Sequence, residues 1–277
     1  LQPAEDAPHV HGPIRVELHA RGPLKRPAEW ATTLDLDTAA LKENARNAPL
    51  VLRGPFSYKP AGWEGPGRTI WIGGKGASYV PIGELPPIVG LAVTTSEDAG
   101  FYGHQGFDLE GLQNGLAAAM GGTKLRGGST LTQQLVKNIY LSSERTMARK
   151  ITEALITLQV EAALPKQRIL EVYLNIIEWG PGVYGIGEAA RYYFGIDARS
   201  LNTKQAVFLA SIIPSPTHWG PAFRHSGLTE AWNQRLAGIL QTLHQRGNLG
   251  DAQYERAMDE PLIFRGESEG ATLTRGQ

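Results

Sequence analysis

The chain is organised around residues 127–153, which read GGSTLTQQLVKNIYLSSERTMARKITE. This stretch opens on two glycines, enters a helix through a Ser/Thr pair and carries two glutamines before it becomes strongly basic. The pattern from Thr130 to Gln133 is a capping box, which predicts a helix over residues 131–140. Neutral amides, cations and one acid in so short a stretch suit the binding of an anionic, hydroxyl-rich ligand better than a plain core.

Working outward from this stretch, apolar residues at helical spacing predict a mostly α-helical domain. Ser142 or Ser143 is expected to cap the next helix, and Pro165 to end it. Gly247 is placed to follow the helix at 229–246 as its C-cap. The predicted helices cover residues 86–97, 131–140, 143–164, 166–179, 185–194, 204–213, 229–246 and a last one from 251, all within residues 85–263.

The flanking segments differ in character from this domain. Residues 1–84 contain short β-rich runs at 14–20, 50–53 and 69–72, bounded by Gly and Pro, which predict a small β-rich N-terminal domain or extension. Asp37 is expected to cap a short helix over 38–44. Residues 264–277 are polar and glycine-rich and predict a flexible tail.

Composition excludes several classes of protein. The 27 Lys+Arg residues balance the 27 Asp+Glu residues, so no global field favours nucleic acid, and the absence of Cys removes disulfides and thiolate metal sites. The chain has no HExxH motif, no P-loop and no GxGxxG after a strand, so a zinc site and nucleotide binding find no support. No apolar run approaches the roughly 18 residues that span a bilayer, so we expect any membrane anchor to be absent from this chain.

A candidate general base lies at the end of the first predicted helix. Helical spacing would place Glu97, Phe101 and His104 on one face. Glu97 adjoins Asp98, and repulsion with partial burial would raise its basicity, as a general base requires. The plainer alternative is a surface acid pair with a histidine at the end of the helix.

A basic cluster surrounds the second candidate carboxylate, Glu153. Cations beside a helix N-terminus suit phosphate or pyrophosphate. The alternative is a solvated basic face in which Arg149 and Glu153 form an ordinary helix ion pair. Two carboxylates on separate helices beside such a cluster indicate chemistry on a glycosyl phosphate. The cluster contains Arg126, Lys137, Arg145, Arg149 and Lys150, with Gln133, Gln134 and Asn138 among them.

The order of these motifs resembles the peptidoglycan glycosyltransferases. The chain contains EDxxFxxHxGxD from Glu97, GGSTLTQQLVKN from Gly127 and RKxxE from Arg149, followed by ILEVYLN and GVYGIGEAARYYFG from Ile169 and Gly182. The resemblance covers about two thirds of the chain, is closest to the monofunctional branch, and implies a lysozyme-like, two-lobed helical fold. Ala99 and Gly100 depart from the family, which often has larger, basic residues there, and can loosen the helix after Glu97.

The resemblance implies polymerisation of lipid II into β-1,4 glycan strands, with inversion and release of undecaprenyl pyrophosphate. By matched position, Glu97 resembles the general base that deprotonates the acceptor 4-hydroxyl, and Glu153 the second glutamate that positions the donor. The residues implied to bind substrate are Asp98, Phe101, His104, Arg126, Ser129, Thr130, Gln133, Gln134, Lys137, Arg149 and Lys150.

The resemblance also implies partners and a location. The partners would be lipid II, the growing glycan strand and the membrane surface, which a mobile segment at 109–126 would contact, while residues 1–84 could recruit other cell-wall synthesis proteins. The site would lie on the outer, periplasmic face of the bacterial cytoplasmic membrane. No protein-bound metal is predicted, and the need for a divalent cation (Mg or Mn) stays open. Two alternatives also remain: a catalytically weak lipid-pyrophosphate-binding or scaffolding module, and a lysozyme-like lytic enzyme.

Overall fold

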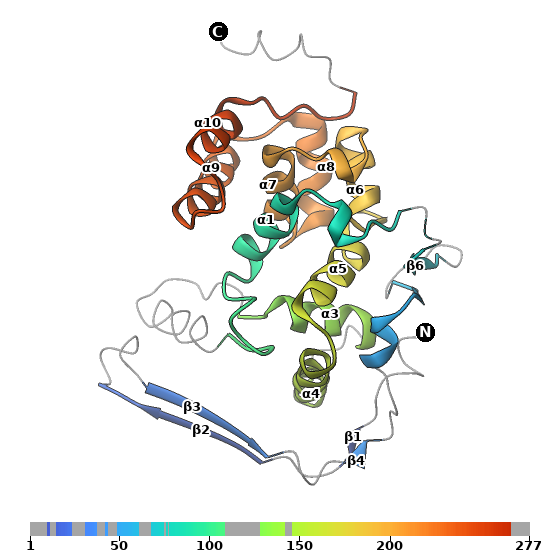
Figure 1. The fold of residues 1–277 in the computed structure, drawn as a ribbon, viewed down its shortest axis with the longest axis vertical. Helices are drawn as coiled ribbons and strands as arrows, with labels where there is room; N and C mark the ends of the chain where they lie inside the picture. The colour runs from blue at the N-terminus through green and yellow to red at the C-terminus, as the bar shows by residue number, and fades with distance from the viewer. Residues whose placement is uncertain are drawn as a thin grey trace. The chain divides into compact units, whose positions relative to one another are not determined.

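The computed structural model describes residues 10–11, 15–23, 31–37, 42–43, 49–60, 68–74, 76, 78–108, 128–141 and 146–266. The chain divides into two compact units, and each is formed from two separate segments (Figure 1). The first contains residues 1–62 and 100–169, and the second contains residues 63–99 and 170–277. The described residues are mainly helical with a few short strands, as the sequence predicts.

The first unit is built on two packed helices, α3 and α4. Thr130 caps α3 through the predicted capping box, in which the Thr130 and Gln133 side chains each accept from the other's backbone N–H. Thr146 caps α4 by accepting a hydrogen bond from the Arg149 N–H. The elements are β1 (Val10–His11), β2 (Arg15–Arg21), β3 (Ala31–Asp37), β4 (Lys42–Glu43), η2 (Pro49–Arg53), β5 (Phe56–Tyr58), α3 (Leu131–Tyr140) and α4 (Met147–Ala163).

The N-terminal strands of this unit form two antiparallel ladders, β2 with β3 and β1 with β4. Further along the chain, η2 is tied to the α-helical part of the same unit. The Arg53 guanidinium donates to the carbonyl of Ala163 at the end of α4, and Arg168 donates to the carbonyls of Leu52 and Gly54.

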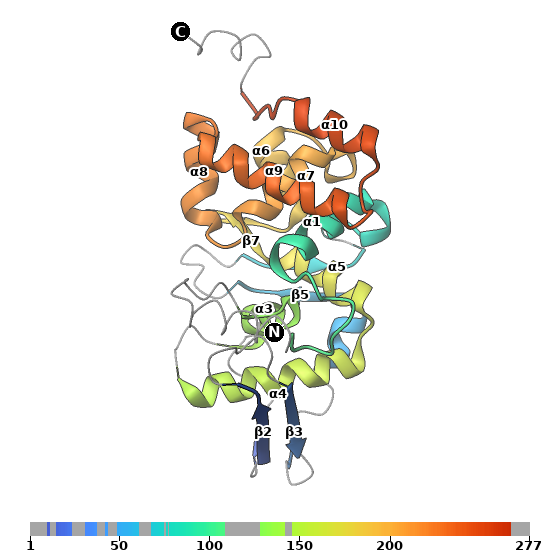
Figure 2. The ribbon, with the colours of Figure 1, turned by 90° about the vertical axis from the view of Figure 1, so that its left-hand side faces the viewer.

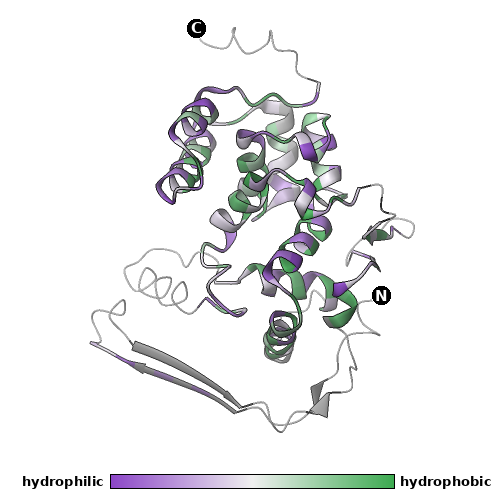
Figure 3. Cartoon of the chain, viewed as in Figure 1, coloured by the Kyte–Doolittle hydropathy of each residue, from purple (hydrophilic) through white to green (hydrophobic). Residues whose placement is uncertain are grey.

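The second unit contains the remaining helices, together with the part of α5 that extends beyond residue 169. α1 packs against α7 and α9, and α10 packs against α7 and α9 (Figure 2). In Figure 3, α9 is hydrophilic along one side and hydrophobic on the other, the arrangement expected of a surface helix. The elements are β6 (Ile70–Ile72), η3 (Ile82–Glu84), α1 (Pro87–Glu97), α5 (Lys166–Ile176), β7 (Glu178–Gly180), β8 (Val183–Tyr184), α6 (Ile186–Phe194), η4 (Ala198–Ser200), α7 (Thr203–Ile212), α8 (Pro216–Ser226), α9 (Glu230–Gln245) and α10 (Asp251–Asp259).

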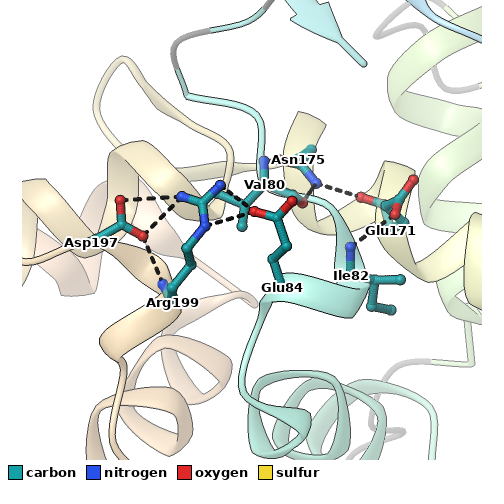
Figure 4. Close-up of polar contacts among 7 residues, drawn as sticks. All are labelled: Val80, Ile82, Glu84, Glu171, Asn175, Asp197 and Arg199. Atoms are coloured by element: carbon teal, nitrogen blue, oxygen red, sulfur yellow. Dashed lines mark hydrogen bonds and ion pairs between the residues drawn. The ribbon is translucent and has the colours of Figure 1, made fainter. Parts of the chain in front are cut away.

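A polar clamp on α5 fixes the extended segment that leads into α1 (Figure 4). Asn175 is 1% exposed, and its side-chain amide accepts from the Val80 N–H and donates to the Val80 carbonyl, both at 2.9 Å. One turn earlier, Glu171 accepts from the Ile82 N–H at 2.8 Å and from the Tyr79 hydroxyl at 3.0 Å. These bonds satisfy backbone groups that have no strand partner among the described residues, so they hold the segment that precedes α1 in place.

Several sequence predictions are confirmed at this level. α1, α3, α6, α7, α9 and α10 lie within about a residue of their predicted bounds. The expected strands at 14–20 and 69–72 correspond to β2 and β6. Gly247 follows α9 with a φ of 73°, the left-handed conformation expected of a residue that ends a helix.

Other predictions are wrong, each for a local reason. Residues 50–53 lie in the 3-10 helix η2, so their apolar run is not a strand. The short helix over 38–44 does not form, because Asp37 ends β3 and Lys42–Glu43 form β4. The helix predicted over 166–179 stops at Ile176, since Glu178–Gly180 pair with Val183–Tyr184.

Two further helix predictions need correction. The cap of α4 is Thr146 and not Ser142 or Ser143, which lie outside the described residues. α8 was not predicted, because its Pro216, Gly220 and Pro221 suggest a loop. The predicted boundaries at residues 84 and 263 stay predictions, as does the flexibility of the tail. No helix in the described part of the chain has both the length and the hydrophobicity to cross a membrane.

The clamp yields a stability prediction. Asn175→Ala removes both partners of the Val80 backbone groups, and Val80 is only 2% exposed. We expect a loss of about 2–4 kcal/mol in the free energy of unfolding, because buried polar groups without partners are costly. Urea denaturation followed by tryptophan fluorescence measures this loss. The control is Asn233→Ala at an exposed position of α9, where the change should stay within about 0.5 kcal/mol. An equal effect of the two substitutions would contradict the clamp.

Candidate functional site

The predicted site residues fall into both compact units. Glu97 and Asp98 belong to the second unit. Arg126, with the segment at 109–126, and Arg145 lie outside the described residues. The other predicted residues lie in the first unit: Phe101, His104, Ser129, Thr130, Gln133, Gln134, Lys137, Arg149, Lys150 and Glu153.

In the first unit, Glu153 is a buried carboxylate held by two cations from its own helix. Its side chain is 3% exposed, and Oε2 accepts from Arg149 Nη1 at 3.0 Å while Oε1 accepts from Lys150 Nζ. Two positive charges around one negative charge leave a net positive charge on this face of α4. Because an anion experiences that excess, the arrangement suits a ligand with negative charge.

Arg149 and Lys150 retain capacity for such a ligand. The Arg149 Nε is buried and has no hydrogen-bond partner among the described residues. The Lys150 side chain is 47% exposed, although its ammonium contacts Glu153. The ion pair predicted as an alternative therefore exists, and both cations have further N–H donors beyond those that contact Glu153.

On α3, the two glutamine side chains lie in different environments. Gln133 is 5% exposed, and its side-chain oxygen accepts from the Thr130 N–H at 2.9 Å. The Thr130 hydroxyl donates to the Gly106 carbonyl at 2.7 Å. These bonds give Thr130 and Gln133 a structural role, and their predicted contact with substrate stays a prediction.

The accessible side of α3 is formed by Gln134, Lys137 and Asn138, at spacings of three and four residues. Lys137 is exposed, and no described residue forms an ion pair or hydrogen bond with its ammonium. Gln133, which spacing alone placed beside Lys137, faces the interior instead. Gln134 and Lys137 are therefore the pair from this helix that a ligand can reach.

The loop over residues 101–108 is fastened to α3 and α4. Phe101 is 1% exposed, and the Lys166 ammonium lies 4.5 Å from the centre of its ring. That ammonium also donates to Glu161 at 2.8 Å, and Glu161 accepts from the Thr132 hydroxyl. The sequence interpretation missed Lys166 and Glu161, because nothing local relates them to a loop so far away in the chain.

His104 is oriented by this loop. The Gly106 N–H donates to His104 Nδ1 at 3.1 Å. Because Nδ1 accepts a hydrogen bond, a neutral His104 ring carries its proton on Nε2. His104 therefore presents a donor at Nε2 as long as the loop keeps this turn.

In the second unit, α1 ends at Glu97 and Asp98 is its C-cap. The prediction that Glu97, Phe101 and His104 share one helical face is therefore wrong, because the chain leaves the helix and turns at residues 99–103. Gly100 and Gly103 remove the side chains that would favour a continued helix. Glu97 is partly exposed, whereas Asp98 is 5% exposed.

Two residues near Glu97 were not predicted. Tyr173 of α5 is fully buried, and burial, followed by the negative charges of Glu97 and Asp98, holds the pKa of its phenol well above the ordinary value. Arg246 follows α9, and its guanidinium donates to the Ala99 carbonyl at 3.2 Å across 147 residues of sequence. Tyr173 lies within the ILEVYLN motif, but no role was predicted for its side chain, and the sequence contains no signal for Arg246.

The described residues contain no group of three or more His, Asp or Glu side chains that could hold a metal ion.

Comparison with known proteins identifies the class to which this site belongs. The model of the transglycosylase family matches residues 68–244, a range that contains both Glu97 and Glu153. The chain belongs to the transglycosylase family.

Similar proteins agree with this assignment. The biosynthetic peptidoglycan transglycosylase of Pseudomonas aeruginosa is 47% identical over 169 residues, covering 59% of this chain and 69% of the relative. That of Chromohalobacter salexigens is 42% identical over 190 residues, covering 67% of this chain and 79% of the relative. A crystal structure of penicillin-binding protein 1A from Haemophilus influenzae aligns with 48% of this chain and 16% of its own at 21% identity, with a TM-score of 0.32, too low to establish a shared fold.

Because the loop over residues 101–108 packs against α4, we predict that alanine substitutions at Gly106 and Gly238 have opposite effects on stability. Gly106 has a φ of 89°, and an added Cβ would lie 2.7 Å from the Thr157 Cγ2, so Gly106→Ala should destabilise the chain by about 1–3 kcal/mol. Gly238 lies within α9 with nothing within 4 Å of an added Cβ, so Gly238→Ala should stabilise it by about 0.5–1 kcal/mol. Thermal unfolding measured by circular dichroism tests both, and shifts of the same sign would contradict this account.

Proposed function

We propose that this chain is a biosynthetic peptidoglycan glycosyltransferase that polymerises lipid II into β-1,4 glycan strands. The observation that carries the proposal is the transglycosylase match over residues 68–244, within which Glu153 is buried against Arg149 and Lys150. Its relatives in Pseudomonas aeruginosa and Chromohalobacter salexigens are biosynthetic peptidoglycan transglycosylases. Peptidoglycan synthesis implies that the reaction takes place on the extracytoplasmic side of the membrane.

Each half of the site has a distinct part in the proposed reaction. Glu97 removes the proton from the 4-hydroxyl of the acceptor sugar as that oxygen attacks the anomeric carbon of the donor. The bond from the anomeric carbon to the pyrophosphate oxygen breaks on the opposite side, so an α-linkage becomes a β-1,4 linkage. The departing lipid pyrophosphate takes the bonding electrons, and the proton remains on Glu97 until solvent removes it.

The cations of the first unit stabilise the departing pyrophosphate. Arg149, Lys150 and Lys137 contribute positive charge to this half of the site. Glu153 holds Arg149 and Lys150 in place before the donor arrives. Ser129 and Gln134 complete the proposed donor side, with Thr130 and Gln133 supporting it through the cap of α3.

The partners are proposed on the same basis. Lipid II and the growing strand are the substrates, the membrane surface delivers the lipid, and residues 1–84 could recruit other proteins of cell-wall synthesis. The fold implied by this function is lysozyme-like and two-lobed. The alternatives, a binding module and a lytic enzyme, are separated by the first experiment below.

Glu97→Gln tests the proposed base. With labelled lipid II in detergent, we expect polymerisation to fall about 10²–10⁴-fold, because general base catalysis contributes that much. Binding of lipid II, measured by thermophoresis, should be retained, since the amide keeps the shape of the side chain. Polymer made equally by both proteins would contradict the role of Glu97. Binding without polymerisation by the unsubstituted chain would favour the binding module, and cleavage of preformed glycan would favour the lytic enzyme.

Lys137→Ala tests the anion-binding half. We expect the affinity for inorganic pyrophosphate to fall about tenfold, because a hydrogen bond to a charged group contributes roughly 1.5–3 kcal/mol. The slope of affinity against salt should also decrease, since one charge is lost. Isothermal titration calorimetry measures both quantities. Lys59→Ala, at another exposed lysine of the same unit, is the control, and an equal loss in the control would remove Lys137 from the site.

A further inference from the structure

The C-terminal end of α1 places negative charge beside the proposed base, Glu97. Glu97 follows ten residues of helix, whose C-terminal end carries partial negative charge, and it adjoins the buried Asp98. Both effects favour a proton on Glu97 and raise its basicity. The ionised fraction of Glu97 therefore depends on which other charged or polar groups lie at this end of the helix.

Tyr173 approaches from the buried side. α1 and α5 pack closely at Gly90, where an added Cβ would lie 3.2 Å from Leu170 Cδ2. Tyr173 is one turn further along the same side of α5, at a spacing of three residues from Leu170. It is fully buried, and its phenol stays protonated, because burial and the charges of Glu97 and Asp98 hold its pKa well above the ordinary value. A protonated hydroxyl orients its positive end toward nearby negative charge.

Arg246 approaches from the solvent side. Its Nη1 donates to the Ala99 carbonyl at 3.2 Å, two residues beyond Glu97, which brings a positive charge to the end of α1. A guanidinium has five N–H donors, and this bond uses one of them. The positive charge of Arg246 offsets the partial negative charge at the C-terminal end of α1 and the negative charge of Asp98. Asp98 from α1, Tyr173 from α5 and Arg246 after α9 are thus among the described titratable and charged groups at this end of the helix.

We propose that Tyr173 and Arg246 are positioning residues that keep Glu97 ionised beside Asp98, Tyr173 from the interior and Arg246 from the solvent. The inference rests on the proposed function, in which Glu97 is the general base. It goes beyond that function by assigning the protonation state of Glu97 to two residues outside the motifs of the donor side.

The test is the dependence of kcat/KM on pH for the full chain. A base works only when deprotonated, so the rate rises with pH through its titration and then reaches a plateau. Tyr173→Phe and Arg246→Gln should each move this acidic limb to higher pH, by about half a unit to one unit, because each removes a group that favours the charged form. The plateau above the limb should change less than the rate below it.

Matched controls separate this role from a merely structural one. Tyr193→Phe removes another fully buried hydroxyl of the same unit, which donates to the Trp179 carbonyl at 2.7 Å. Arg256→Gln removes an exposed charge on α10. Neither should move the limb. Arg246→Lys keeps the charge, so the acidic limb of its kcat/KM profile should lie at the same pH as that of the unsubstituted chain.

A direct titration makes the result independent of activity. The carboxyl carbon of Glu97 can be followed by ¹³C NMR in the full chain and assigned by its loss in Glu97→Gln. We expect its midpoint to rise in Arg246→Gln, whose exposed position makes a folding defect improbable, and in Tyr173→Phe. An unchanged midpoint and an unchanged limb in both variants would overturn the inference, even if Glu97→Gln is inactive and the proposed function stands. Full activity of Glu97→Gln would instead contradict the proposed role of Glu97 as the general base, on which this inference rests.

Discussion

The structure depends most on the pairing between the Asn175 side chain and the backbone of Val80. An asparagine amide has the same donor and acceptor as a peptide group, so Asn175 takes the place that a neighbouring strand would otherwise fill. The extended segment before α1 can then be buried without a sheet. Glu171 adds a bond to the Ile82 N–H one turn away, and Arg199 joins Glu84 in the following 3-10 helix to Asp197 (Figure 4). Because α1 starts where this segment ends, the position of Glu97 at its other end follows from a side chain on α5.

Glu153 is held by ion pairs, because a buried carboxylate needs positively charged partners. A carboxylate that loses its water incurs a desolvation penalty of several kcal/mol, which only close partners can offset. Arg149 and Lys150 supply two such partners from the same helical turn. The arrangement does more than neutralise the acid, because it orders two long cationic side chains before any ligand is present. Less side-chain entropy is then lost when an anion binds.

The sequence predicted those features that are decided within a few residues of each other. The capping box at Thr130 and Gln133, the start of α1 after Pro86 and the end of α9 at Gly247 all depend on local hydrogen bonding or backbone geometry. Predictions failed where distant partners decide. Residues 50–53 have a strand-like composition but form a 3-10 helix tied by Arg53 and Arg168 to other segments. The predicted continuation of α1 to His104 is an exception, because it failed for a local reason: two glycines within the stretch permit a turn.

The same distinction applies to the candidate site. Glu97, Glu153 and the cations of α4 are visible in the sequence because each belongs to a compact motif, whereas Arg246 is 147 residues from the carbonyl it contacts. At the end of α1, local groups and groups from distant parts of the chain therefore have opposite effects on the protonation of Glu97. The helix end and Asp98 come with the local sequence and favour the protonated form of Glu97, while Tyr173 and Arg246 come from other helices and favour the ionised form. A change in the helix end, Asp98, Tyr173 or Arg246 would alter the balance between the two forms of Glu97. The basicity of Glu97 therefore depends on how α1, α5 and α9 pack.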